Sequence, residues 1–470
     1  MSTRPQELVE AALAASGADG CVVVATEHSE TNLRWAGNSL TTNGQTSTRS
    51  VTVVSTFDRP DGTSAGVVTR SVASLEEIDD LVRASEEAGR DAAPADDAMP
   101  LVKNYPHDDD WAADARHTDV GVFDDFAPAL GRAFRSWQDT HGLLYGFAEH
   151  HLTSTFLGTS TGLRRRFDQP DGRVEINGKS ADLARSAWIG RHTVDFTDID
   201  VDALIGDLEQ RLQWAATRLE LPPGRYETIL PPTAVADLMV YTYWNLSARD
   251  AEEGRNVFAR SDSASGNGDG AATRIGERLA ELPLTLRSDP AAPGLFCSPF
   301  EVATSSSAGV QSVFDNGQPV PPVDWIQDGT LHELVRTRSW AQRTGSAPRP
   351  YVDNLVLDGG GSRDLEQMIA GTERGLLLTC LWYIREVDPQ NLLLTGLTRD
   401  GVYLVEDGEV RGAVNNFRFN ESPVDLLARA SEVGATVPAM SREWNDYFRR
   451  TAMPALRIPD FNMSTVSQAS

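Results

Sequence analysis

The sequence contains few cysteines and no long apolar segment. Its three cysteines, Cys21, Cys297 and Cys380, are far apart and form no Cys-x-x-Cys pair. This spacing excludes a disulfide framework and a thiolate zinc knuckle, and it favours a reducing compartment. No window approaches the ~18 consecutive apolar residues that a membrane-spanning helix needs. The first ten residues, MSTRPQELVE, lack the apolar core of a signal peptide. We therefore expect a cytoplasmic protein.

Basic residues are also scarce. The chain of 470 residues has 42 lysines and arginines against 68 aspartates and glutamates, a formal net charge of −26. A general nucleic-acid binder needs basic surface to displace counterions, so this charge argues against that class. An acidic surface favours solubility and suits a basic partner or substrate.

Local motifs for metal or nucleophilic catalysis are missing. A zinc peptidase needs two histidines about one helical turn apart and a glutamate that activates water. The only His-Glu pair, His332-Glu333, has no second histidine at that spacing. His150 and His151 are adjacent, but neighbouring side chains of a strand point to opposite faces, so they cannot easily share a metal. We therefore assign no catalytic, cofactor-binding or metal-binding residue. The eight histidines are His28, His107, His117, His141, His150, His151, His192 and His332.

The patterns of the first half predict an antiparallel sheet with helices. Short apolar runs separated by turn residues are typical of a strand meander. Ser74 followed by Glu77 is a capping-box pattern that opens a helix. We expect strands at residues 21–26, 33–36, 49–57, 66–72, 142–149 and 153–158, turns at Asp171-Gly172 and Asn177-Gly178, and helices at residues 5–16, 74–89, 123–137 and 201–219.

Leu221-Pro222-Pro223-Gly224 is the predicted domain boundary, because two prolines and a glycine cannot continue a helix. After it, turn residues and short apolar runs predict a β-rich half. The Asp407-Gly408 pair supplies the positive φ angles of a tight type I′ turn between strands at 402–405 and 410–414. Asp364 with Gln367 indicates a helix cap. We also expect a strand at 226–230, helices at 233–246 and 364–370, and further helix between 424 and 450.

These patterns predict an α+β fold with two domains. Residues 1–220 form an N-terminal antiparallel sheet with helices, and residues 221–470 form a C-terminal β-rich domain. One basic triplet, Arg164-Arg165-Arg166, stands out on this acidic chain. It could hold a peptide carboxylate or an acidic partner. We favour the alternative that these arginines pair with nearby acids on a solvated strand face.

Several segments together resemble the TldD/TldE (PmbA) peptidase family. The strongest matches are Thr372-Glu373-Arg374-Gly375-Leu376-Leu377 and residues 395–408, within the block 371–414. Residues 33–38, 47–51 and 160–163 resemble the family's first strands and a mid-chain motif. The resemblance covers most of the chain and implies a C-terminal domain curled toward a barrel. It also implies one of two kinds of subunit, of which only the TldD type carries zinc.

The zinc ligands of the TldD type have no counterpart here. That type has a His-Glu-x-x-x-His motif on the helix opening the second half, matching residues 240–258, VYTYWNLSARDAEEGRNVF, which contain no histidine. It also uses a cysteine near the carboxy terminus, whereas this chain has none after Cys380. The chain therefore resembles the metal-free TldE/PmbA-type subunit.

The resemblance implies a non-catalytic subunit of a heterodimeric metallopeptidase that acts on unfolded peptides. Its partner would be a TldD-type, zinc-bearing subunit, and no cofactor is expected in this chain. The sequence leaves open whether a homodimer forms without that partner. Two alternatives also stay open: an autonomous peptidase using carboxylates with His150 or His332, and a regulatory or binding module without hydrolytic activity, as older family naming around DNA gyrase modulation would suggest.

Overall fold

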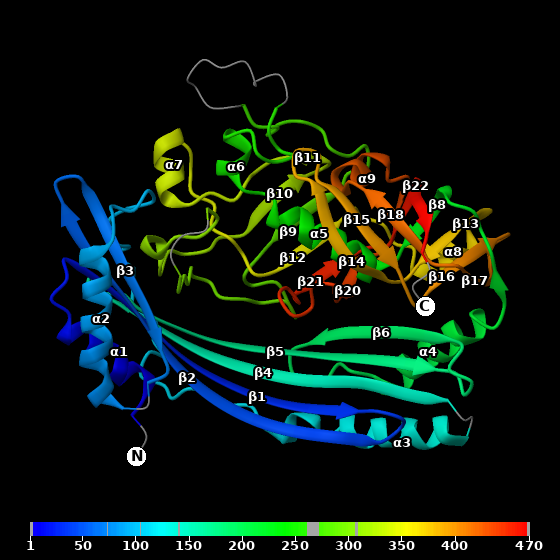
Figure 1. Ribbon diagram of the computed structural model, residues 1–470, viewed down its shortest axis with the longest axis horizontal. Coiled ribbons are helices and arrows are strands. Elements are labelled where there is room, and N and C mark those ends of the chain that lie inside the picture. The colour runs from blue at the N-terminus through cyan, green and yellow to red at the C-terminus, as the bar shows by residue number, and fades with distance from the viewer. Residues whose placement is uncertain are drawn as a thin grey trace.

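A curved six-stranded antiparallel sheet forms the N-terminal half of the molecule (Figure 1). The computed structural model describes residues 3–72, 74–103, 105–139, 142–260, 272–305 and 309–467. The strand order is β3-β2-β1-β4-β5-β6, and β1, β2 and β3 form the predicted antiparallel meander. The strands are β1 Gly20–Trp35, β2 Leu40–Arg59, β3 Gly62–Arg70, β4 Leu143–Thr159, β5 Arg164–Lys179 and β6 Ser186–Thr193.

The central strands β1 and β4 are longer than predicted. The apolar runs 21–26 and 33–36 belong to the single strand β1, and the runs 142–149 and 153–158 belong to β4. Side chains alternate between the two faces of a strand. Cys21 and Val23 therefore pack under helices on one face, while Val22 and Val24 pack against Phe300 of the C-terminal half on the other. One continuous strand thus serves two separate cores.

Four helices cover the outer face of the curved sheet (Figure 1). α1 Pro5–Ala15 and α2 Ile78–Asp91 pack at one end, and α3 Phe126–Asp139 and α4 Val201–Trp214 pack at the other. α2 is preceded by the 3-10 turn η1 Leu75–Glu77, and Ser74 makes no side-chain cap hydrogen bond, so the predicted capping box is wrong. α3 follows a second 3-10 turn, η2 Val120–Phe123.

The predicted turns at Asp171-Gly172 and Asn177-Gly178 are wrong. Both lie inside β5, which pairs continuously with β4 across them. Neither glycine has a positive φ. A Cβ at position 172 would approach Phe196, and one at position 178 would meet the Trp137 ring at 2.6 Å. These glycines therefore make room for aromatic rings of the outer core and do not turn the chain.

The C-terminal half is β-rich, as predicted, and its strands form two mixed sheets. One has the order β11-β10-β9-β12-β21-β20, and the other has the order β14-β15-β18-β22-β8-β13-β16-β17-β7 with β19 beside β22. Its strands are β7 Arg218–Leu219, β8 Gly224–Leu230, β9 Thr285–Ser288, β10 Val323–Gln327, β11 Thr330–Leu331, β12 Leu355–Asp358, β13 Arg374–Leu378, β14 Leu381–Asp388, β15 Leu393–Thr398, β16 Val402–Glu406, β17 Glu409–Val414, β18 Phe417–Glu421, β19 Glu432–Val433, β20 Val437–Ala439, β21 Thr451–Met453 and β22 Leu456–Val466. Its helices are α5 Pro232–Trp244, α6 Ala248–Glu252, α7 Arg338–Thr344, α8 Leu365–Ala370 and α9 Pro423–Arg429, with the 3-10 turn η4 Val313–Asp315.

Local turn chemistry predicted part of this half correctly. Asp407 and Gly408 have φ angles of 52° and 77° and join β16 to β17. Asp364 and Gln367 form a complete capping box at the start of α8. The helix expected between 424 and 450 stops with α9 at Arg429, because β19 pairs with β22 and β20 with β21. The helix expected to reach 219 ends at Trp214, since β7 pairs with β17.

The C-terminal half lies against the inner, concave face of the curved sheet (Figure 1). At one end the contact is apolar, between β1 and the segment around Phe300 and Phe314. Toward the other end it is charged. Arg449 contacts Glu149 at 2.7 Å, and Arg450 contacts Asp171 at 2.9 Å. The arginines of the loop between β20 and β21 therefore join the two halves of the molecule.

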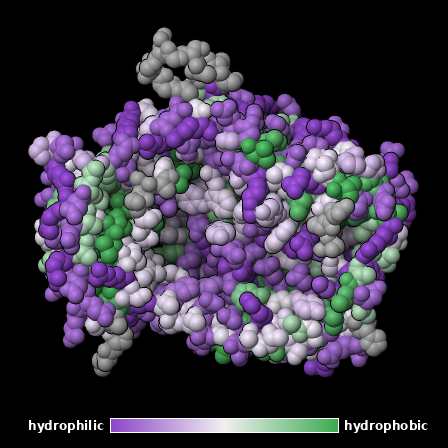
Figure 2. Space-filling view, in the orientation of Figure 1, coloured by the Kyte–Doolittle hydropathy of each residue, from purple (hydrophilic) through white to green (hydrophobic). Residues whose placement is uncertain are grey.

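The surface is mostly polar. Figure 2 shows hydrophilic side chains over most of one face, with apolar side chains in small separate groups. This distribution matches the strongly acidic composition. No described helix combines the length and apolar character needed to cross a membrane.

Candidate functional site

The segment 240–258, where the resemblance places the zinc motif, forms the end of α5 and all of α6. α5 ends at Trp244, and Ser247 caps α6 by accepting a hydrogen bond from the Asp250 backbone N–H at 3.2 Å. The Asn245 amide donates to the Tyr241 carbonyl at 3.0 Å. The helix expected at 233–246 is thus followed by a second, short helix. The polar side chains at the junction between the two helices form hydrogen bonds with nearby backbone groups.

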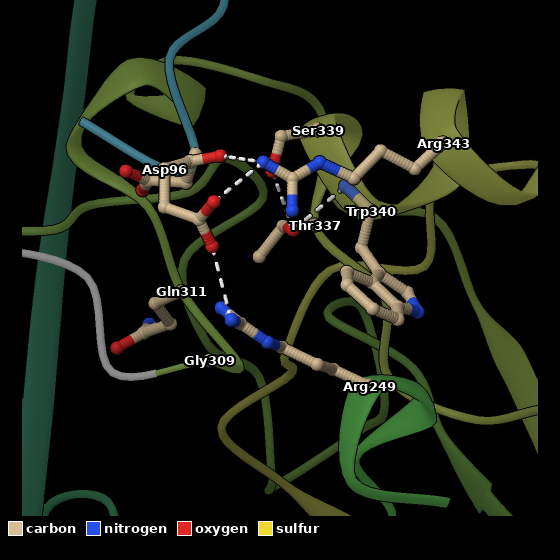
Figure 3. A pocket seen from close by; sticks show the side chains of 9 residues that line it. Asp96, Arg249, Gly309, Gln311, Thr337, Ser339, Trp340 and Arg343 are labelled. Atoms are coloured by element: carbon tan, nitrogen blue, oxygen red, sulfur yellow. Dashed lines mark hydrogen bonds and ion pairs between the residues drawn. The ribbon is translucent and has the colours of Figure 1, made fainter. Parts of the chain in front are cut away.

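The carboxylates around α6 are already paired. Asp250 contacts Arg255 at 2.5 Å, Glu253 contacts Arg249 at 3.1 Å, and Glu252 accepts a hydrogen bond from the Trp340 indole N–H at 2.8 Å. Figure 3 shows the small pocket beside this helix, where Asp96 lies between Arg249 and Arg343. The distances from Asp96 to these two arginines are 3.0 and 2.8 Å.

Aromatic side chains occupy the space beside α5. Trp444 packs against Tyr241 and Trp244, with ring centroids 5.4 and 5.2 Å apart. Tyr243 is fully buried and stacks on Tyr351 at 4.9 Å. The Tyr243 hydroxyl donates to the Val352 carbonyl at 2.9 Å and accepts from the Val352 N–H at 2.8 Å. These contacts make the end of α5 part of the packed core.

Asp237 is the buried acid of α5. Its Oδ1 accepts hydrogen bonds from the Ser441 hydroxyl at 2.7 Å and from the Glu443 backbone N–H at 2.8 Å. Burial raises the pKa of Asp237 to about 7. The carboxyl group is therefore neutral in a large share of molecules near pH 7, which makes it a poor metal ligand.

The three cysteines are buried and stay protonated. Burial raises the pKa of Cys21 to about 11 and those of Cys297 and Cys380 to about 12. A zinc ligand must be a thiolate. Together with the paired carboxylates of α6 and the absence of histidine from 240–258, this donor set does not fit the zinc site of the TldD type.

The adjacent histidines of β4 point to opposite faces, as predicted. His150 faces the helices, where its ring nitrogens contact the Thr118 hydroxyl at 2.6 Å and the Val194 carbonyl at 2.8 Å. Burial lowers the pKa of His150. His151 faces the C-terminal half. His332 is exposed just after β11, and His141 lies outside the described residues.

His151 joins two residues of β1 in a compact cluster. Glu30 lies directly opposite His151 in the β1–β4 register, and His28 is two residues away on the same face. His28 Nε2 is 3.2 Å from His151 Nδ1, and the nearest Glu30 oxygen is 3.9 Å from the same nitrogen. Candidate ligand atoms of the three side chains all lie within 4.8 Å of one another.

Surrounding residues orient this cluster. His151 Nε2 is 3.1 Å from a Glu149 oxygen, and His28 Nδ1 is 2.9 Å from the Thr153 hydroxyl. Burial and the neighbouring His151 lower the pKa of His28, so its imidazole is neutral near pH 7. Burial alone would raise the pKa of Glu149, but His151 and two arginines lower it below its usual value.

This cluster was not predicted, because its three residues are not close together in the sequence. The pattern His28-x-Glu30 puts two such groups on one face of a strand, which is a usable signal. The third ligand comes from a strand more than a hundred residues later, and only the register of β1 against β4 brings it close.

The basic triplet pairs with acids, as predicted, but the strand face is not fully solvated, because Arg166 is buried and Arg164 and Arg165 are half-buried. Its ion pairs are Arg164–Glu10 at 2.6 Å, Arg165–Asp108 at 3.3 Å, Arg166–Asp110 at 2.5 Å and Arg166–Asp168 at 2.9 Å.

A cleft of about 950 Å³ opens between the end of the curved sheet and the ten-stranded sheet. Tyr145 and Lys179 line it from the first half, and Trp382, Arg399 and Arg442 line it from the second. The Arg442 guanidinium lies over the Trp382 ring at 4.8 Å. Aromatic and cationic side chains at the rim suit an extended peptide with a free carboxylate.

Comparisons with known proteins place this architecture in a class of metallopeptidases. Residues 223–465 match the sequence model of the PmbA/TldA metallopeptidase C-terminal domain. This match spans more than half of the chain, which therefore belongs to the TldD/TldE (PmbA) family. No curated protein sequence matches the chain.

Solved structures share the fold over nearly the whole chain. TldE from Thermococcus kodakarensis is 16% identical, with a TM-score of 0.73, over 97% of this chain and 99% of that one. A proposed modulator of DNA gyrase from Bacteroides thetaiotaomicron is 14% identical, with a TM-score of 0.75 and 98% of each chain covered. A second proposed gyrase modulator, from Thermotoga maritima, is 15% identical with a TM-score of 0.72, over 94% of this chain and 95% of that one.

Proposed function

We propose that this chain is the non-catalytic subunit of a TldD/TldE-like metallopeptidase complex, lacking the family's catalytic zinc. The main support for the proposal is the composition of residues 240–258 and the pairing of their carboxylates. They contain no histidine or cysteine, and their three carboxylates pair with Arg255, Arg249 and Trp340. A partner of the TldD type would supply the metal, its activated water and the glutamate base.

The proposed contribution of this chain is to bind and enclose unfolded peptides. The cleft between the two halves is about 950 Å³, which is enough for a short extended segment. Trp382 and Arg442 offer an apolar surface and a positive charge at its wall. Extended peptides also bind to sheet edges through backbone hydrogen bonds, and β3 and β6 form the edges of the curved sheet.

The experiment is a peptidase assay of three samples: this chain alone, a zinc-bearing TldD-type subunit alone, and the two mixed. We expect no hydrolysis of unfolded peptides by this chain and the highest activity in the mixture. The two chains should elute together in size-exclusion chromatography. A matched control omits this chain and adds an unrelated acidic protein at the same concentration.

Other outcomes would favour the alternatives. Hydrolysis by this chain alone would support an autonomous peptidase and contradict the proposal. Failure to co-elute with any zinc-bearing homologue, together with an unchanged activity of the mixture, would contradict the heteromeric assembly. Salt-sensitive DNA binding would support a regulatory module related to gyrase, although the net charge of −26 opposes it.

A further inference from the structure

We propose that His28, Glu30 and His151 form a binding site for a divalent transition-metal ion of the zinc class. The ligands come from β1 and β4 of the curved sheet, and none comes from residues 240–258, where the resemblance places the zinc motif. All three residues lie outside residues 223–465, the part of the chain that matches the metallopeptidase domain. The inference does not depend on the proposed function.

The spacing of the ligand atoms suits a four-coordinate ion. Zinc binds imidazole nitrogen at about 2.0–2.1 Å, so two ligands of a tetrahedral site lie about 3.4 Å apart. His28 Nε2 and His151 Nδ1 are 3.2 Å apart. The Glu30 oxygen, at 3.9 Å from His151 Nδ1, belongs to a side chain that is 26% exposed. A small rotation of this carboxylate therefore completes the three-ligand set.

The second ring nitrogen of each histidine has an oxygen nearby, as in many metal sites. Histidine ligands usually donate their other ring N–H to an oxygen, which fixes the tautomer and orients the ring. A Glu149 carboxylate oxygen lies 3.1 Å from His151 Nε2 without hydrogen-bond geometry, and the Thr153 hydroxyl is in place to accept from His28 Nδ1 at 2.9 Å. The facing nitrogens, His28 Nε2 and His151 Nδ1, form a hydrogen bond with each other at 3.2 Å, and a bound metal ion would replace the proton that they share.

The charge balance also favours a cation here. Glu149 is neutralised by Arg173 at 2.9 Å and Arg449 at 2.7 Å. Within the described residues, no arginine or lysine forms an ion pair with Glu30, which accepts only the Asn32 amide at 2.9 Å and lies 3.9 Å from His151 Nδ1. A bound metal ion would give Glu30 the cationic partner that the described residues do not supply.

Two imidazoles and one carboxylate select the type of ion. Imidazole suits zinc, copper, iron and nickel, whereas magnesium and calcium prefer oxygen ligands alone. Three protein ligands leave the fourth position of a tetrahedral ion for water. The His151 side chain is 17% exposed, so solvent reaches the site.

The test uses the full-length chain without a histidine tag, after removal of metal with a chelator. Cobalt(II) is titrated in and followed by its visible absorption, and zinc(II) is then used in competition. We expect one cobalt ion per chain with tetrahedral-type absorption, displaced by zinc and not by magnesium. His28→Ala and His151→Ala should weaken binding by about 100-fold or more, and Glu30→Gln by about 10-fold or more.

His332→Ala is the matched control, because His332 is exposed and lies outside the cluster, and it should bind cobalt like the wild type. Circular dichroism and thermal melting show whether each variant is folded, and Glu30→Gln, which keeps the side-chain shape, carries the test if a histidine variant unfolds. The proposal is overturned if the wild type takes up no cobalt or zinc. It is equally overturned if folded His28→Ala or Glu30→Gln binds with wild-type affinity.

Discussion

Two regions of this molecule contain residue types that metal sites use. They differ in whether those side chains already form ion pairs and hydrogen bonds with other residues. Around α6, Asp250, Glu252 and Glu253 already bind arginines or an indole N–H. On the curved sheet, His28, Glu30 and His151 face one another, and no arginine or lysine of the described residues forms an ion pair with Glu30. The segment where the resemblance places the zinc motif is thus part of the packed structure, whereas the sheet holds a set of convergent ligand atoms.

The comparison teaches that the number of acidic residues is a poor guide to a metal site. The segment 240–258 contains three acidic residues and the sheet cluster needs only one. What matters is whether a lone pair is left after the protein's own hydrogen bonds are made, and whether outer partners hold the ligand in the right orientation.

If the end of α5 belongs to the packed core, removing the Tyr243 ring should strongly destabilise the folded chain. Tyr243→Ala removes a fully buried side chain, and we expect a loss of ~3–5 kcal/mol in the free energy of unfolding. Tyr243→Phe keeps the ring and leaves the Val352 N–H and carbonyl without their partner, at a cost of ~1–3 kcal/mol. Urea denaturation measures both values. Losses below ~0.5 kcal/mol would show that this region is not packed as described.

The buried acid of α5 should make stability depend on pH. The pKa of Asp237 is about 7 in the folded chain and about 3.9 when unfolded. The contribution of Asp237 to stability is therefore full below pH 4 and is lost as the pH rises to 7, by roughly 4 kcal/mol at most.

Asp237→Asn cannot titrate, so its stability relative to the wild type should rise between pH 4 and pH 8. Thermal melting across this range measures the difference. A constant difference between the two proteins at every pH would contradict the raised pKa.

The sheet cluster should depend on its outer partners. Thr153→Val keeps the side-chain shape and removes the oxygen next to His28 Nδ1, so cobalt affinity should fall about 10-fold. The cobalt titration of the purified chain measures this, with Glu30→Gln as the reference. If Thr153→Val binds like the wild type while Glu30→Gln is weakened, Thr153 does not orient His28.

The exposed ion pairs beside α6 should contribute little individually. Arg249→Gln removes the contacts of Arg249 with Asp96 and Glu253, but Arg343 and Arg255 still pair with these acids. We expect a change of less than ~1 kcal/mol in unfolding free energy, because surface pairs are screened, and no cobalt binding at α6. A clear gain of cobalt binding in this variant would show that pairing alone had blocked a metal site there.

Sequence patterns correctly predicted the structural features that are determined by residues close together in the sequence. The Asp407-Gly408 turn and the Asp364–Gln367 cap follow from local backbone chemistry and are present as expected. The absence of the zinc motif from 240–258 could likewise be read directly. The opposite orientation of His150 and His151 followed from strand geometry alone.

Features that depend on distant contacts could not be predicted. Gly172 and Gly178 resemble turn residues, but Phe196 and Trp137 pack where their side chains would be. The segment after Arg429 has helical patterns, but its pairing with β21 and β22 makes it extended. The metal-ligand cluster requires the register between β1 and β4, which no local pattern specifies.

The position of β1 at the centre of the curved sheet has a consequence for synthesis. β1 ends at Trp35, but its second partner, β4, begins only at Leu143. At translation rates of about 5–20 residues per second, one edge of β1 stays unpaired for roughly 5 to 20 seconds. That edge includes the apolar run from Cys21 to Ala25, so the nascent chain should be most prone to aggregation, and most in need of chaperones, before β4 emerges from the ribosome.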